Sequence, residues 1–203
     1  MRASKHIVGL DLGQMGDFSA LADLCFTPDV RPVYHVPTLH RWQLGTSYTD
    51  IAKDLAAFLK QPGMAEAELV IDQTGVGLAV AELIHRELTD AGIKKPFVGI
   101  TITGGAAVNR ISLRQWNVAK RQLVSAISAV VHSGRILVAK DQPEAAALIR
   151  EMSTFKSKIN INTGNESFEA HRERDHDDLV LAVAIACWAA ERPRARAGSF
   201  VAK

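Results

Sequence analysis

Long hydrophobic segments are absent from this sequence, and their absence excludes a membrane-spanning helix. The longest stretch without a polar side chain, residues 179–190, has 12 residues, whereas a helix needs about 20 to cross a bilayer. The N-terminal segment has no secretory hydrophobic region and reaches an acidic residue at Asp11, so we expect no signal peptide. The sequence therefore predicts a protein with no membrane partner.

Cysteine is scarce as well. Cys25 and Cys187 both lie in apolar segments, which is typical of a reducing, cytoplasmic compartment and not of a disulfide-stabilised fold. Hydrophobic residues at 47% and charged residues at 23% exclude a disordered or collagen-like chain. A length of 203 residues suits one domain of ordinary size. We expect this domain to cover residues 1–191 and a basic, mobile tail to cover residues 192–203.

The charges are spread unevenly along the chain, although the formal net charge is only +2. Residues 1–100 contain 9 Lys and Arg against 12 Asp and Glu, whereas residues 101–203 contain 15 against 10. An acidic half and a basic half in one domain favour a polyanionic partner held near a site that requires cations.

The hydrophobic pattern predicts a mixed α/β fold. Three short strand-like runs come first, then helices alternate with strands, and Leu179–Ala190 is apolar enough to be a buried helix. This order is typical of a ribonuclease H-like fold, with a mixed five-stranded sheet flanked by helices, an extra C-terminal hairpin and a final helix. The predicted strands cover 6–12, 19–26, 33–39, 69–71 and 97–102, with a short extended segment at 136–139 and a hairpin over 159–168. The predicted helices cover 48–60, 76–88, 113–133, 142–152 and 178–191.

Three acidic positions stand out by their place in this pattern. Asp11 ends the first predicted strand, Asp72 ends the fourth, and Asp177-Asp178 begins the final helix. Functional sites in open α/β sheets form just beyond the carboxyl ends of strands. Carboxylates about 4 Å apart repel each other by roughly 4 kcal/mol at an effective dielectric constant of about 20, so such a cluster needs cations or raised pKa values. Hard oxygen ligands suit Mg²⁺ or Mn²⁺, and two such ions can bracket a phosphodiester.

Each of these acids also has a simpler interpretation. An Asp after a strand is commonly a turn former, and an Asp at a helix start is commonly a cap. The metal-site hypothesis depends on all three positions lying on elements that the predicted fold brings together.

Four sequence blocks follow one another in order over residues 5–190: GLDLGQMGDFSAL, VIDQTGVGLAV, WNVAKRQLVSAISAVVHSGRI and HDDLVLAVAIA. With these blocks the sequence resembles the nuclease domain of the phage large terminase subunit. The resemblance implies that Asp11, Asp72 and Asp178 bind two Mg²⁺ or Mn²⁺ ions and cut double-stranded DNA during viral genome packaging. It also implies Asp177 as an alternate ligand and Asp17 as a supporting residue.

The chain departs from complete terminase subunits in one respect, because it contains no G-x-x-x-x-G-K-[ST] phosphate loop. The resemblance therefore implies a packaging ATPase as a separate domain or chain, together with a small terminase subunit and a portal, in the cytoplasm of an infected host. Three other hypotheses remain: a Holliday-junction resolvase of the same fold, a catalytically degenerate nuclease fold that only binds DNA or assembles, and half of an actin-like kinase.

Basic residues could hold the DNA backbone beside the acidic cluster, and the alternative for each is an ordinary solvated side chain. His176 precedes the acid pair and could touch a metal or phosphate, although such a histidine is more often a solvated neighbour. The candidate DNA contacts are Arg110, Arg114, Lys120, Arg121, Lys156, Lys158, Arg172 and Arg174.

Overall fold

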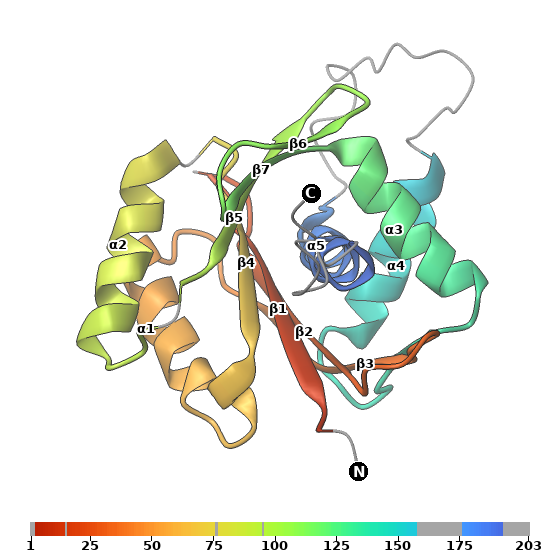
Figure 1. Cartoon of the computed structure of the whole chain (residues 1–203), viewed down its shortest axis with the longest axis horizontal. Helices are drawn as coiled ribbons and strands as arrows, with labels where there is room; N and C mark the ends of the chain where they lie inside the picture. The colour runs from red at the N-terminus through yellow and green to blue at the C-terminus, as the bar shows by residue number, and fades with distance from the viewer. Residues whose placement is uncertain (1–2, 15, 76, 95, 158–175, 193–203) are drawn as a thin grey trace, which may run out of the picture.

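The computed structural model describes residues 3–14, 16–75, 77–94, 96–157 and 176–192. A single mixed sheet runs through the domain, with helices on both faces (Figure 1). Its strands are β1 (Lys5–Asp11), β2 (Ala20–Phe26), β3 (Tyr34–Arg41), β4 (Glu68–Asp72), β5 (Val98–Thr103), β6 (Val108–Arg110), β7 (Gln115–Ala119) and β8 (Ile136–Val138). Its helices are α1 (Tyr48–Leu59), α2 (Gly77–Asp90), α3 (Lys120–His132), α4 (Ala145–Ser157) and α5 (Asp178–Glu191), with a short 3-10 turn at Met64–Glu66.

The strand order is β6-β7-β5-β4-β1-β2-β3-β8. The first three strands, which match the three predicted strand-like runs, form an antiparallel meander, and β4 adds to β1 in parallel. Further along, β5 is parallel to β4, and β7 is parallel to β5. The neighbours β1 and β4 are almost wholly buried on both faces, which explains why each reads as a continuous apolar run without alternation.

Two apolar cores lie on opposite faces of the sheet. Helices α1 and α2 cover one face, where Leu55 and Ile84 are fully buried. Helices α3, α4 and α5 cover the other face, and α5 lies between the sheet and its two companions. Ser47 caps the N-terminus of α1, because its hydroxyl accepts a hydrogen bond from the backbone N–H of Asp50 over 3.1 Å.

Helix α5 is buried from Asp178 to Ala189, as its uniformly apolar sequence predicts. It crosses β1 at Gly9, where a Cβ atom would lie only 2.1 Å from the carbonyl oxygen of Ala182. A residue without a side chain is therefore required for the helix to sit this close to the sheet.

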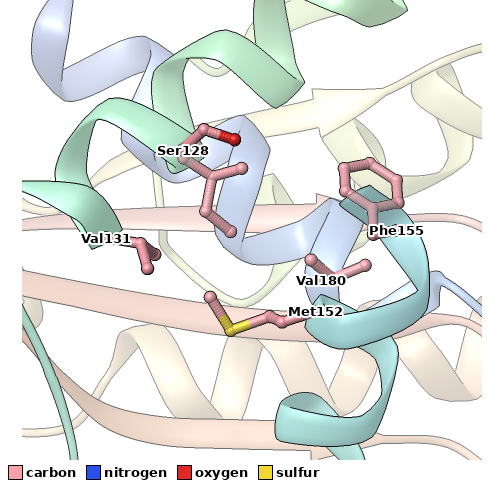
Figure 2. Close-up of a pocket in the computed structure, with 6 residues that line it drawn as sticks. Ser128, Val131, Met152, Phe155 and Val180 are labelled. Atoms are coloured by element: carbon pink, nitrogen blue, oxygen red, sulfur yellow. The ribbon is translucent and has the colours of Figure 1, made fainter. Parts of the chain in front are cut away.

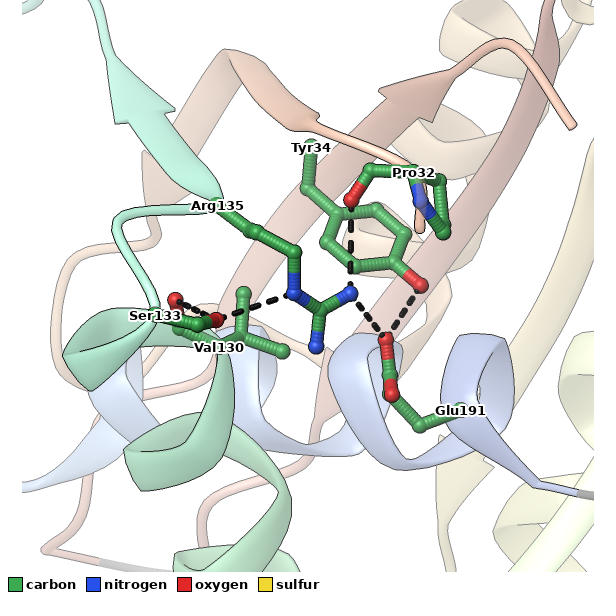
Figure 3. A network of polar contacts seen from close by, with 6 residues as sticks. All are labelled: Pro32, Tyr34, Val130, Ser133, Arg135 and Glu191. Carbon is green, nitrogen blue, oxygen red and sulfur yellow. Dashed lines mark hydrogen bonds and ion pairs between the residues drawn. The ribbon is translucent and has the colours of Figure 1, made fainter. Parts of the chain in front are cut away.

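The C-terminal end of α5 is held by a polar network (Figure 3). The Glu191 carboxylate accepts a hydrogen bond from the Tyr34 hydroxyl over 2.6 Å and pairs with the Arg135 guanidinium over 2.8 Å. These bonds tie α5 to β3 and to the loop after α3. The next residue, Arg192, pairs with Glu68 at the start of β4.

The ribonuclease H-like fold class is confirmed, but the predicted count of five strands is wrong. The sheet has eight strands in the described part of the chain, and β6 and β8 contain only three residues each. The helix predicted over 113–133 is also wrong in its first part, because Gln115–Ala119 is strand β7 and α3 begins at Lys120. This segment is a strand and not a helix because it pairs with both β5 and β6. The hairpin predicted over 159–168 lies outside the described residues.

No helix in the described part of the chain is long and apolar enough to span a membrane.

Candidate functional site

Two of the predicted acids meet at the carboxyl ends of neighbouring parallel strands. In the register of β1 and β4, Leu10 is opposite Ile71, so Asp11 and Asp72 follow side by side on strands about 4.8 Å apart. Because alternate residues of a strand share a face, Asp11 lies on the same face as Gly9, against α5. Asp72 likewise shares a face of β4 with Val70, which packs in the core beneath α5. Both carboxylates therefore lie on the side of the sheet that α5 covers.

The third acid reaches this place from α5. Ala182 of α5 packs against Gly9 of β1. Asp178, the first residue of α5, lies about one helical turn before Ala182. Asp11, Asp72 and Asp178 are only 7%, 5% and 6% exposed. The fold thus gathers three buried carboxylates from three separate segments of the sequence.

Burial raises the pKa values of all three carboxylates, and nearby negative charges add to the rise at Asp11 and Asp178. The pKa of Asp11 lies well above its usual value, first because of burial and then because of the nearby charges of Asp72, Asp178 and Asp177. Burial also raises the pKa of Asp72, against the lowering effect of hydrogen bonds from Thr74. The hydroxyl and backbone N–H of Thr74 both donate to the same carboxylate oxygen, over 2.5 and 2.8 Å.

Asp178 shows the same effect at the third position. Burial raises its pKa to about 7, and the charges of Glu151 and Asp177 add to the rise, whereas Arg41 lowers it. One of its carboxylate oxygens, Oδ2, is buried without a hydrogen-bond partner among the described residues. The Nδ1 atom of His176 lies 3.8 Å from that oxygen, beyond hydrogen-bonding distance.

The two adjacent acids at the start of α5 have different surroundings. The side chain of Asp177 is 31% exposed and pairs with the Lys120 ammonium over 3.1 Å, whereas the side chain of Asp178 is only 9% exposed. Asp178 is thus the member of the pair that is buried in the acidic cluster, and Asp177 lies at its rim.

Lys120, predicted as a DNA contact, lies inside the acidic cluster. It begins α3, and its ammonium pairs with Asp177. Its positive charge also lowers the pKa values of Asp11 and Asp72. Part of the repulsion among the carboxylates is therefore offset by a cation that the chain itself supplies.

The other predicted residues are more scattered. Asp17 is exposed in the loop between β1 and β2, where its backbone N–H donates to the carbonyl of Gln14. His176 is 47% exposed and contacts the ring of Phe18 edge-on at 4.6 Å. Arg121, next to Lys120 in α3, is exposed.

Arg110 lies away from the carboxylates, at the other end of α5. Its guanidinium bonds two carbonyls of the turn between β6 and β7 and lies 5.4 Å from the centre of the Trp116 ring. Trp116 in turn contacts Trp188. Trp188 lies ten residues after Asp178 on α5, and so about 15 Å further along the helix. Arg114 is exposed near the same turn. The prediction that it lies near the start of a helix is wrong. Lys156 lies on α4, and Lys158, Arg172 and Arg174 fall outside the described residues.

Sequence reasoning missed three residues of this site. Thr74 could have been found, because a hydroxyl two residues after an Asp commonly bonds back to it in a tight turn. Arg41 and Glu151 had no such local signal. They pair across 110 residues of sequence, beneath the start of α5.

The chemistry of the donor set fits a hard divalent cation. Three buried carboxylates supply oxygen ligands of the kind that Mg²⁺ and Mn²⁺ prefer. The Oδ2 atom of Asp178, which accepts no hydrogen bond from the described residues, is a further candidate ligand atom. Within the described ranges, no three Asp, Glu, His or Cys side chains are gathered closely enough around one point to hold an ion. Some adjustment of side chains would therefore accompany metal binding.

A small apolar pocket between α3, α4 and α5 offers no alternative site (Figure 2). Met152, Phe155 and Val180 are among the residues that line it, and its volume is about 10 Å³. This is close to the minimum for one water molecule.

Comparisons with known proteins agree with the ribonuclease H-like fold. Residues 8–189 match the family described as the terminase RNaseH-like domain. The nuclease domain of human cytomegalovirus terminase has a similar structure, with a TM-score of 0.55 and 9% identity over 92% of this chain and 84% of that one. A manganese-soaked structure of the same viral domain gives a TM-score of 0.54 and 14% identity over 90% and 81% of the two chains.

A weaker likeness links the chain to RuvC of Thermus thermophilus, with a TM-score of 0.41 and 8% identity over 91% of this chain and 92% of that one. No match was found among curated protein sequences.

Proposed function

Because the chain belongs to the family of terminase RNase H-like domains, we propose that it is a divalent-metal-dependent endonuclease that cuts double-stranded DNA during viral genome packaging. The observation that carries this proposal is the convergence of Asp11, Asp72 and Asp178. Each is almost fully buried, and each comes from a different element of the fold. A cluster of like charges that raises its own pKa values costs stability, and such arrangements are concentrated at functional sites.

In this proposal Asp11, Asp72 and Asp178 hold two Mg²⁺ or Mn²⁺ ions, with Asp177 as an alternate ligand. Bound divalent ions supply Lewis-acid activation of water and stabilisation of the leaving oxygen in phosphodiester hydrolysis. The likeness to a manganese-soaked viral nuclease domain is consistent with this choice of ion.

The residues around the ligands have separate parts in the proposal. Thr74 fixes the orientation of the Asp72 carboxylate through its two hydrogen bonds. Lys120 balances the carboxylate charge in the absence of metal, and can turn to a DNA phosphate when cations replace it. Asp17 and His176 are supporting residues at the rim of the site in this proposal.

Binding of DNA would depend mainly on phosphate contacts, with little preference for sequence. Lys120 lies at the site itself, and Arg121 follows it on α3. In this proposal Arg110 and Arg114 contact the duplex further along. Lys156, Lys158, Arg172 and Arg174 complete the proposed set. We propose the packaging ATPase, the small terminase subunit and the portal as protein partners in the host cytoplasm.

A plasmid-cleavage assay on the purified chain tests the proposal. We expect the protein to nick or linearise plasmid with Mn²⁺ but not with EDTA. Asp72→Asn removes one ligand charge while preserving size, and should reduce cleavage by at least about 100-fold, since loss of even an outer partner of a metal ligand costs 10–100-fold. Asp90→Asn, the same change at an exposed position on α2, is the matched control.

The proposal is wrong if Asp72→Asn cuts as fast as the unaltered chain. A protein that binds DNA and never cuts it would instead support the degenerate fold. Preferential cleavage of branched over linear DNA would support a resolvase.

A further inference from the structure

Glu151 is a buried carboxylate that the proposed ligand set does not include. It lies on α4, is 7% exposed, and accepts a hydrogen bond from the backbone N–H of Val180 over 3.0 Å. The backbone N–H of Leu179 also donates to it. Its side-chain partner is the guanidinium of Arg41, at the end of β3. The Glu151 carboxylate therefore joins α4 and β3 to the first turn of α5.

The first turn of α5 has no cap of its own. The first N–H groups of a helix lack partners within the helix, and the N-cap side chain commonly supplies one. Asp177 stands at the N-cap position but forms no cap hydrogen bond with its side chain, and its carboxylate pairs with Lys120 instead. Glu151 takes over the capping role from another helix, and its negative charge suits the positive end of the α5 dipole.

The turn that Glu151 caps is the one that carries Asp178. An Asp side chain has only two rotatable bonds, so the position of its carboxylate follows the backbone closely. Arg41 braces the same region, with its guanidinium 5.3 Å from the centre of the Phe18 ring. The ring of Phe18 contacts His176, just before α5 begins. The approach to Asp178 is thus fixed by contacts from β3, α4 and the loop between β1 and β2.

We propose that Glu151, together with Arg41, is a positioning residue that holds Asp178 in the orientation needed to bind a metal ion. This inference rests on the proposed function, in which Asp178 is a ligand. Glu151 is not a ligand itself, because its carboxylate is engaged by backbone N–H groups and by Arg41. Its contribution is to keep the first turn of α5 from shifting when cations enter or leave.

Glu151→Gln tests the proposal with the least change of shape. The amide oxygen can still accept one hydrogen bond, but the NH₂ group meets the donors of Arg41 or of the helix backbone. We expect Mn²⁺ affinity, measured by titration calorimetry, to fall by about 10-fold or more. Plasmid cleavage should lose kcat while KM for DNA stays within about 2-fold. In metal-free protein, amide hydrogen exchange at Val180 should become faster.

Glu82→Gln is the matched control, because Glu82 is exposed on α2, across the sheet. This variant should behave as the unaltered chain in all three measurements. If Glu151→Gln does not fold, Glu151→Asp keeps the charge and withdraws the carboxylate by one methylene. That variant is expected to show the same loss of Mn²⁺ affinity.

Asp178→Asn separates the failure of this inference from failure of the proposed function. If Asp178→Asn loses Mn²⁺ binding while the folded Glu151 variant binds Mn²⁺ as tightly as the unaltered chain, Glu151 is only a helix cap and the inference is wrong. If Asp178→Asn itself binds Mn²⁺ normally, the proposed ligand set is wrong.

Discussion

At its C-terminal end α5 presents Glu191 to Arg135 and Tyr34, whereas at its N-terminal end it presents Asp178 to other carboxylates. The first arrangement satisfies its charges, and the pKa of Glu191 is lowered chiefly by the hydrogen bond from Arg135. The second leaves a buried oxygen of Asp178 without a hydrogen-bond partner among the described residues. Both ends belong to one rigid, buried helix, so the difference between them comes from their neighbours.

This contrast indicates what each end is for. A fully bonded polar network holds an element in place. A set of buried like charges opposes folding, and such local conflicts in natural proteins occur mostly at functional sites. The C-terminal end therefore anchors α5, and the anchor allows the N-terminal end to hold carboxylates that a cation would stabilise.

The most damaging change should be one that unseats the helix and so disrupts both ends at once. Gly9→Ala would place a Cβ atom 2.1 Å from the carbonyl oxygen of Ala182, and neither backbone can move without displacing the core. We expect a loss of about 3 kcal/mol or more in the free energy of unfolding, at the upper end of overpacking effects. Urea denaturation followed by circular dichroism measures it.

Gly105→Ala is the control for this change, since a Cβ atom at Gly105 meets nothing within 4 Å. A variant at Gly9 as stable as the one at Gly105 would show that α5 does not pack against β1 as closely as described.

The two ends should also respond to pH in opposite directions. The pKa of Asp178 is raised from 3.8 to about 7 in the folded state, so its contribution to stability is present at low pH and is lost as pH rises through that range. The shift corresponds to roughly 4 kcal/mol at most, in metal-free protein. Because the pKa of Glu191 is lowered, its contribution is present above its ordinary pKa and is lost as pH falls through the lowered value.

Thermal unfolding in EDTA between about pH 2 and pH 8 tests this contrast, because the range covers both the raised pKa of Asp178 and the lowered pKa of Glu191. Asp178→Asn should flatten the decline of stability between about pH 4 and 7, although Asp11 and Asp72, whose pKa values are also raised, still contribute to it. Glu191→Gln should leave that decline intact and remove part of the loss of stability in acid. Identical pH profiles for the two variants would contradict the difference between the ends of α5.

The placement of the acidic residues near the N-terminal end of α5 could be predicted from the sequence better than the elements around them. Asp11 and Asp72 each follow a continuous apolar strand, and Asp178 precedes an apolar helix, so their convergence followed once β1 and β4 were taken as neighbours. Strand β7 was hidden because Trp116, Ala119 and Leu123 follow the spacing of one helix face, and this pattern continues into α3. Only pairing with β5 makes this segment a strand.

The residues that contact the two ends of α5 could not be predicted from the sequence for a similar reason. Glu151 reaches α5 from 29 residues away, and Tyr34 reaches Glu191 from 157 residues away. Contacts of this kind depend on how whole elements pack, and no local spacing indicates them.

The smallest expected effect concerns a single bond of the C-terminal anchor. Tyr34→Phe removes the hydroxyl that donates to Glu191 over 2.6 Å but keeps the ring, which packs edge-on against Phe26. The ion pair between Arg135 and Glu191 remains, so the loss should be about 1 kcal/mol, or about 2–4 °C in melting temperature. Mn²⁺ affinity should not change, because the N-terminal end keeps its own contacts. A Tyr34→Phe variant of normal stability that binds Mn²⁺ more weakly would show that the two ends of α5 are coupled and not independent.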